Sequence, residues 1–169
     1  MLVDQNCQLM GNTSVFTNYL TKTIRRLNSY MPNEHIDKIE QKMNWFQAVM
    51  RPCIQRLIKA VVGPKVFGLE RCSGDELEAT KAAVLNTICK RLEQMFTSEV
   101  KFLVSSNEPT VVDFVYYNEI IMALFLMKIK GFKRNFPKTE RWITFMNEVS
   151  ELNECADRLA EIIDNYELE

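Results

Sequence analysis

Apolar residues recur every three or four positions through most of this 169-residue chain, which is the spacing of one buried helix face. Only five Gly and five Pro interrupt the pattern, and they fall mostly between the periodic stretches. The stretches cover residues 12–27, 33–62, 73–97, 110–130, 136–149 and 151–166. The pattern predicts an all-α fold, a helical bundle behind a short strand-containing start.

The first eleven residues differ from the rest. Two short apolar runs flank the polar turn 4–6, which predicts a small β-hairpin over residues 1–11. Asn12 or Thr13 is suited to cap the helix that follows, because both side chains accept hydrogen bonds from free amides.

Helix boundaries are readable at several points. Asn33 is expected to cap the second helix, which Pro52 should distort by removing one backbone donor. Gly63-Pro64 should end that helix, and Ser73 with Glu76 forms the spacing of a capping box for the next.

Thr110 and Asp113 form a second capping box, ahead of the most apolar helix of the chain. Residues 114–129 are apolar nearly all round, so this helix should be central and most buried. We interpret the box as structural, with a loss of about 1 kcal/mol on its removal. The aromatic side chains of this helix are expected in the core rather than in a ligand pocket. They are Phe114, Tyr116, Tyr117 and Phe125.

The charge balance argues against two classes of partner. Twenty-one Lys and Arg face 22 Asp and Glu, and no basic stripe stands out, so we expect no nucleic acid. The longest apolar run, residues 120–127, is too short for a membrane-spanning helix of about 20 residues.

Cysteine usage indicates the compartment. Five Cys are scattered without a Cys-x-x-Cys pair, and His35 is the only histidine, so no metal site is expected. An odd number of scattered thiols is typical of a reducing environment. We expect an intracellular protein, cytoplasmic or in an organelle assembly such as a mitochondrial one, and not a secreted one.

Two motifs in the second half carry a family resemblance. Thr110-x-x-Asp113 opens the buried helix, and Phe136-Pro137-Lys138-x-x-x-Trp142 follows it at a fixed distance. In this order and spacing they resemble the second, helical domain of cytosolic glutathione transferases. The resemblance implies the bundle of that domain over residues 31–169.

The first long helix is most similar to the theta class of that family. The matching positions are Trp45, Arg51 and Gly68, although Phe46-Gln47 stands where the class usually has Gln-His. The resemblance implies that Trp45 and Arg51 line a ligand pocket. For Arg51 we favour the alternative, a solvated or ion-paired cation on the flank of the helix.

The start of the chain resembles the end of the family's thioredoxin-like domain, which implies a remnant of that domain over residues 1–30. Asn12-Thr13 matches the acidic-Ser pair that holds the γ-glutamyl end of glutathione, but Asn12 lacks the charge. The segment that activates the glutathione thiol is not matched. We therefore expect no catalytic residue, no cofactor, and at most weakened glutathione binding at Asn12 and Thr13.

The resulting hypothesis is a pseudoenzyme, a glutathione-transferase-like protein without catalysis that serves as an interaction subunit of a larger assembly. Its partners would be other subunits that cover the edge of the thioredoxin remnant, or a second copy in a homodimer. The alternative is a theta-like transferase that conjugates glutathione to electrophiles, seen as a fragment or completed by a separate N-terminal half. A third, weaker interpretation is a carrier of hydrophobic ligands.

Overall fold

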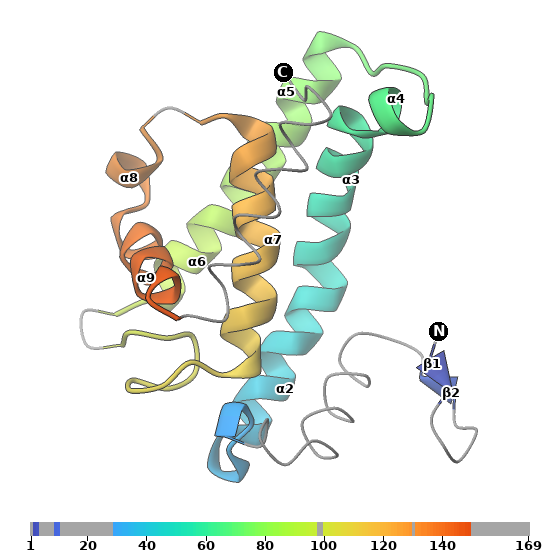
Figure 1. Ribbon diagram of the computed structural model, residues 1–169. Coiled ribbons are helices and arrows are strands. Elements are labelled where there is room, and N and C mark those ends of the chain that lie inside the picture. The colour runs from blue at the N-terminus through green and yellow to red at the C-terminus, as the bar shows by residue number, and fades with distance from the viewer. Residues whose placement is uncertain (1, 4–8, 11–28, 98–99, 130, 150–169) are drawn as a thin grey trace.

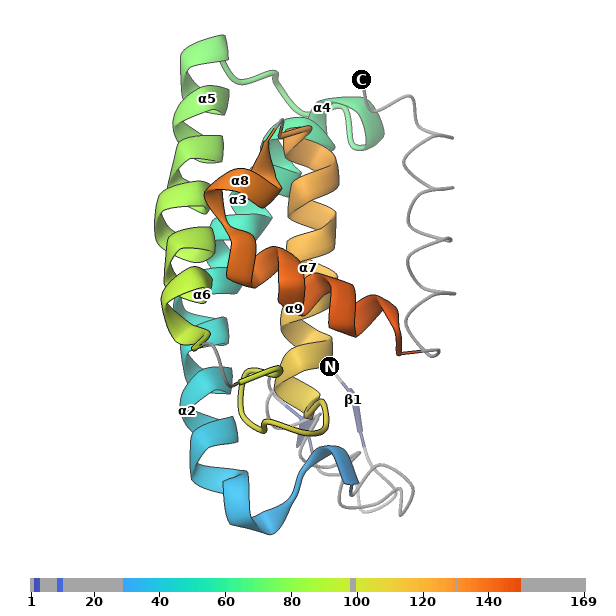
Figure 2. The same ribbon diagram turned by 90° about the vertical axis from the view of Figure 1, so that its left-hand side faces the viewer.

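The computed structural model describes residues 2–3, 9–10, 29–97, 100–129 and 131–149 (Figure 1). Within these ranges the chain is mostly helical, as the apolar periodicity predicts. The long helices run alongside one another, and α9 crosses over α7 (Figure 2). The helices predicted at 12–27 and 151–166 lie outside the described residues.

The two strands of the predicted hairpin are present. β1, Leu2–Val3, pairs antiparallel with β2, Leu9–Met10, so that Leu2 lies opposite Met10. These are the described strands, and the turn between them lies outside the described part of the chain.

The first long helical run begins later than expected. Asn33 lies within a 3-10 turn, η2, Asn33–His35, and caps nothing; α2, Ile36–Trp45, starts after His35 without a side-chain cap. The prediction of an Asn33 cap is therefore wrong. Pro32 places the chain in an extended conformation, and the 3-10 turn supplies the first backbone hydrogen bond, from the His35 N–H to the Pro32 carbonyl at 3.0 Å.

Pro52 distorts this run as expected, and the distortion has a defined form. A π-helical turn, η3, Phe46–Met50, separates α2 from α3, Arg51–Val61. Pro52 thereby falls in the first turn of α3, where its missing N–H costs least. The Tyr116 hydroxyl donates to the Lys42 carbonyl just before the π turn, at 2.8 Å. α3 ends at Val61, just before the Gly63-Pro64 pair, and the pair forms the start of the short α4, Gly63–Val66.

The second helical run also contains a π turn. α5, Gly74–Ala83, leads into η4, Val84–Cys89, and then α6, Lys90–Met95. Its predicted capping box is confirmed: the Ser73 N–H donates to the Glu76 carboxylate at 2.8 Å, and the Glu76 N–H donates to the Ser73 hydroxyl at 3.2 Å.

α7, Val111–Met127, is the central helix, and it contacts α2, α3 and α9. Tyr116 and Tyr117 are buried as predicted, but Phe125 is 41% exposed. The expectation of a core position for Phe125 is therefore wrong, because a helix that is apolar all round does not reveal which face is covered. Lys128, at φ 48°, takes the left-handed conformation that ends the helix, and Gly131, at φ 77°, directly precedes the next short helix.

α6 and α9, Pro137–Asn147, support each other's ends. Glu93 accepts the Lys138 N–H at 3.0 Å and the Thr139 N–H at 2.9 Å, which gives the start of α9 its missing acceptor. In return, the Lys138 ammonium donates to the Phe96 carbonyl at the end of α6, at 2.9 Å. The small α8, Phe132–Asn135, precedes α9.

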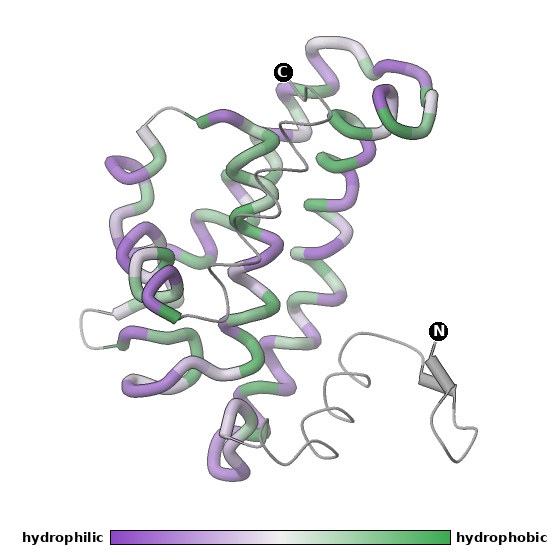
Figure 3. Tube along the Cα trace, in the orientation of Figure 1, coloured by the Kyte–Doolittle hydropathy of each residue, from purple (hydrophilic) through white to green (hydrophobic). Residues whose placement is uncertain are grey.

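Hydrophobic and hydrophilic residues alternate along each helix in Figure 3, and the buried apolar residues form one core cluster. The largest buried side chains come from α2, α3, α7, α9, the two π turns and the end of α6, whereas α5 has no buried residue. They include Trp142, Tyr116, Phe46, Phe96, Ile39, Ile54, Leu57, Ile88 and Ile120. None of the described helices has the length and apolar character needed to cross a membrane.

The Ser73–Glu76 box predicts a pH-dependent stability. Hydrogen bonds from Ser73 lower the pKa of Glu76, so its contribution is present above the ordinary glutamate pKa of about 4.3 and is lost as pH falls through the folded value. Glu76→Gln should therefore destabilise the protein at neutral pH and progressively less below about pH 4. Urea unfolding across pH checks this. Glu70→Gln, an exposed acid before the box, should show no such trend.

Candidate functional site

Asp113 has the most hydrogen bonds of any described carboxylate. Its Oδ1 accepts the Leu103 N–H at 2.7 Å and the Trp142 Nε1–H at 3.1 Å. Its Oδ2 accepts the Thr110 N–H at 2.8 Å and the Thr110 hydroxyl at 2.9 Å. One side chain thus joins the loop before α7, the start of α7, and α9.

Burial decides what this carboxylate can do. Asp113 is 0% exposed, and burial raises its pKa, while the four hydrogen bonds pull the pKa back down. With two donors on each oxygen and no exposed surface, it has no free acceptor to offer a ligand. The arrangement supports the structural interpretation of the Thr110–Asp113 box.

The sequence did not indicate the bond between Trp142 and Asp113, although it singled out both residues. The two belong to separate motifs 29 positions apart. One general rule could have suggested it: a buried indole N–H needs an acceptor, and Asp113 is the acid at the start of the most apolar helix.

Trp45 and Arg51, the expected pocket residues, contact one aromatic cluster on α2, η3 and α7. The Trp45 ring stacks on Tyr116 at 5.9 Å between centroids, and Tyr116 packs on Phe46 at 5.8 Å. The Arg51 guanidinium lies 6.0 Å from the Phe46 ring centre.

Arg51 also has an acidic partner on α7. Its Nη1 lies 3.6 Å from Oε1 of Glu119, whose side chain is only 16% exposed. Burial raises the pKa of Glu119, and the nearby guanidinium lowers it again. The Arg51 guanidinium therefore compensates the charge of the largely buried Glu119 carboxylate.

Gln47 follows Phe46 of this cluster in the sequence, and Phe46-Gln47 stands where the theta class usually has Gln-His. Its Nε2 is buried and donates to no acceptor among the described residues. Sequence reasoning noted the departure at Phe46-Gln47 but not this unpaired donor.

The remaining candidates are less informative. Asn12 and Thr13 lie outside the described residues. Cys53, Cys72 and Cys89 are free thiols, and burial raises the pKa of Cys89 to about 12, which keeps it protonated and unreactive. In the described part of the chain, no three His, Cys, Asp or Glu side chains gather to hold a metal ion.

Comparison with known proteins gives no identification. No protein-family model matches this chain, and neither a curated protein nor a solved structure does.

Removing the Asp113 carboxylate should be costly. Asp113→Ala leaves the buried N–H groups of Leu103, Thr110 and Trp142 without their acceptor, and each such loss costs about 1–3 kcal/mol. We expect a loss of about 3 kcal/mol or more in the free energy of unfolding, measured by urea titration with circular dichroism. Glu108→Ala, an exposed acid in the preceding loop, should change it by less than about 0.5 kcal/mol. Equal effects of the two variants would contradict the structural role.

The Arg51–Glu119 pair predicts a second pH dependence. Without the Arg51 guanidinium, the pKa of Glu119 in the folded protein should rise further. Ionising Glu119 then costs the folded protein more free energy, and this cost appears as the pH rises. Arg51→Met should therefore destabilise the protein more at about pH 7 than at about pH 5, and Arg51→Met with Glu119→Gln should remove the difference. A loss that is the same at both pH values would argue against an internal ion pair.

Proposed function

We propose that this chain is a non-catalytic, glutathione-transferase-like protein whose helical bundle serves as an interaction subunit of a larger assembly. The observation that carries the proposal is an apolar projection at one end of the bundle. Phe67 is 71% exposed and Leu69 is 42% exposed, and both follow α4 directly. Large exposed apolar side chains are typical of contact surfaces between proteins.

The backbone holds this projection in a defined shape. The N–H groups of Phe67 and Leu69 both donate to the Gly63 carbonyl, at 3.0 and 3.2 Å. Gly68 between them has φ 64°, a conformation that residues with a side chain rarely adopt. A Cβ on Gly63 would meet the Leu69 side chain at 3.0 Å, so Leu69 folds back while Phe67 stays outside. A pre-shaped turn loses little entropy when a partner binds Phe67.

The internal use of polar groups supports the same proposal. Asp113 is saturated by its four donors, and Arg51 pairs with Glu119. Trp45 is stacked against Tyr116. Trp45 and Arg51, the residues that the resemblance places in a ligand pocket, thus contact other side chains of the bundle here.

The transferase-like part of the proposal rests on the two motifs of the second half. Their last residues, Asp113 and Trp142, are hydrogen-bonded to each other at 3.1 Å, so the motifs form one structural unit. This supports treating their order and spacing as a family feature rather than as two coincidences.

Two measurements on the whole chain test the proposal. The purified protein should not be retained on immobilised glutathione, nor conjugate glutathione to 1-chloro-2,4-dinitrobenzene above the uncatalysed rate. In native extract of its source cells, a tagged copy should elute well above the size of a 19.8 kDa monomer. Phe67→Ser should move it toward the monomer position, because the exposed anchor is lost.

Glu70→Ala is the matched control, since it changes an exposed polar side chain of the same loop and should leave the elution unchanged. Both variants should keep the wild-type unfolding transition, because neither side chain belongs to the core. Turnover by the purified chain, or its elution from extract as a free monomer, would contradict the proposal and favour a working transferase.

A further inference from the structure

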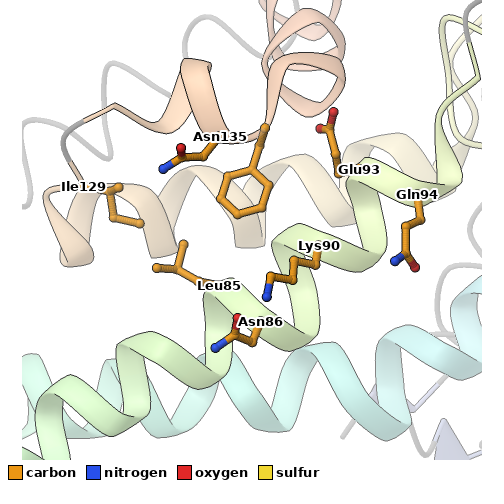
Figure 4. Close-up of a pocket in the computed structure, with 8 residues that line it drawn as sticks. Leu85, Asn86, Lys90, Glu93, Gln94, Ile129 and Asn135 are labelled. Atoms are coloured by element: carbon orange, nitrogen blue, oxygen red, sulfur yellow. The ribbon is translucent and has the colours of Figure 1, made fainter.

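An open groove of about 450 Å³ lies between the α5–α6 run and the turn that joins α7 to α9 (Figure 4). Its apolar floor is formed by Leu85, Ile129 and Phe136. Leu85 comes from the α5–α6 run, and Ile129 comes from the residues after α7 (Figure 4). The volume falls within the range of about 300–1,000 Å³ that is typical of ligand sites.

Three carboxamides surround this floor: Asn86, Gln94 and Asn135. All three residues are exposed, and their side chains form no hydrogen bond with another described residue. A carboxamide both donates and accepts, so it can pair with either polar group of a peptide backbone. The rim therefore matches the chemistry of a polypeptide segment.

The two walls are basic. Residues 82–93 contain Lys90, Arg91 and one acid, Glu93. The described residues 128–129 and 131–138 contain Lys128, Lys133, Arg134 and Lys138 and no acid. Lys90 lines the groove, while Lys133 and Arg134 immediately precede its rim residue Asn135. These three side chains are exposed and pair with no described acid.

Glu93 is the one acid in the lining, and it is already engaged. Its carboxylate accepts the N–H groups of Lys138 and Thr139 and the Thr139 hydroxyl, at 2.9–3.0 Å. These hydrogen bonds do not remove its charge, but the six described Lys and Arg of the two walls outnumber it. The formal charge around the groove is therefore positive, although the whole chain has a formal charge of −1.

We infer that this groove binds a short acidic segment of a partner protein, with one apolar side chain on the floor and its carboxylates facing Lys90, Lys133 and Arg134. The inference rests on the proposed function and names the partner's chemistry. Nucleic acid fits less well, because Phe136 is 7% exposed and cannot stack on a base.

A labelled peptide tests the inference on the whole chain. The probe is fluorescein-EDLEEFDE, measured by fluorescence anisotropy at two salt concentrations. We expect saturable binding that weakens as the salt concentration rises, since the contacts with Lys90, Lys133 and Arg134 are between charges. Replacing every acid of the peptide by Lys, or its Leu and Phe by Ser, should abolish binding.

Two variants locate the site. Lys90→Glu should weaken binding by about tenfold, because it places a like charge opposite the peptide's carboxylates. Lys59→Glu, an exposed lysine on α3 outside the groove lining, should leave the affinity unchanged. In NMR spectra of wild type, the side-chain amide signals of Asn86, Gln94 and Asn135 should shift with peptide.

Other results would overturn the inference: no binding, equal binding to both lysine variants, or shifts elsewhere. Binding of laurate or of single-stranded RNA at the groove, without binding of the acidic peptide, would overturn it too. These failures are separate from failure of the proposed function. If the peptide does not bind but Phe67→Ser still releases the chain from its assembly, only the groove inference is lost.

Discussion

The buried carboxylate of Asp113 is the interaction on which the arrangement of this bundle depends. It accepts hydrogen bonds from four donors in three segments, and so holds the loop and α9 against the start of α7. A charge in an apolar core is costly unless every lone pair is used, and here each oxygen accepts two hydrogen bonds. The Glu93 carboxylate has the same function at the start of α9, where it replaces a local cap.

The consequence for function is a division between interior and surface. Asp113 and the Arg51–Glu119 pair are engaged within the bundle, whereas the apolar projection at Phe67 and the groove near Lys90 face solvent. The proposed role as an interaction subunit rests on these two solvent-facing surfaces. The two surfaces are also chemically different, since the first is apolar and the second combines an apolar floor with basic walls.

Interactions between residues close in sequence could be predicted, whereas interactions between residues far apart in sequence could not. Both capping boxes were predictable because their partners are three residues apart and backbone geometry alone brings them together. The Trp142–Asp113 and Thr139–Glu93 bonds span 29 and 46 positions, so they depend on how helices pack. Asn33 failed as a cap because the extended Pro32 starts a 3-10 turn instead, and Phe125 failed as a core residue because uniform apolarity hides the exposed face.

The exchange rate of the Trp142 indole N–H tests the central claim most directly. If Asp113 accepts this proton inside a closed core, the N–H should exchange with solvent deuterium only through global unfolding, with the protection of the slowest core amides. Exchange within minutes in an otherwise protected core would show that the carboxylate is open to solvent, and would contradict the account.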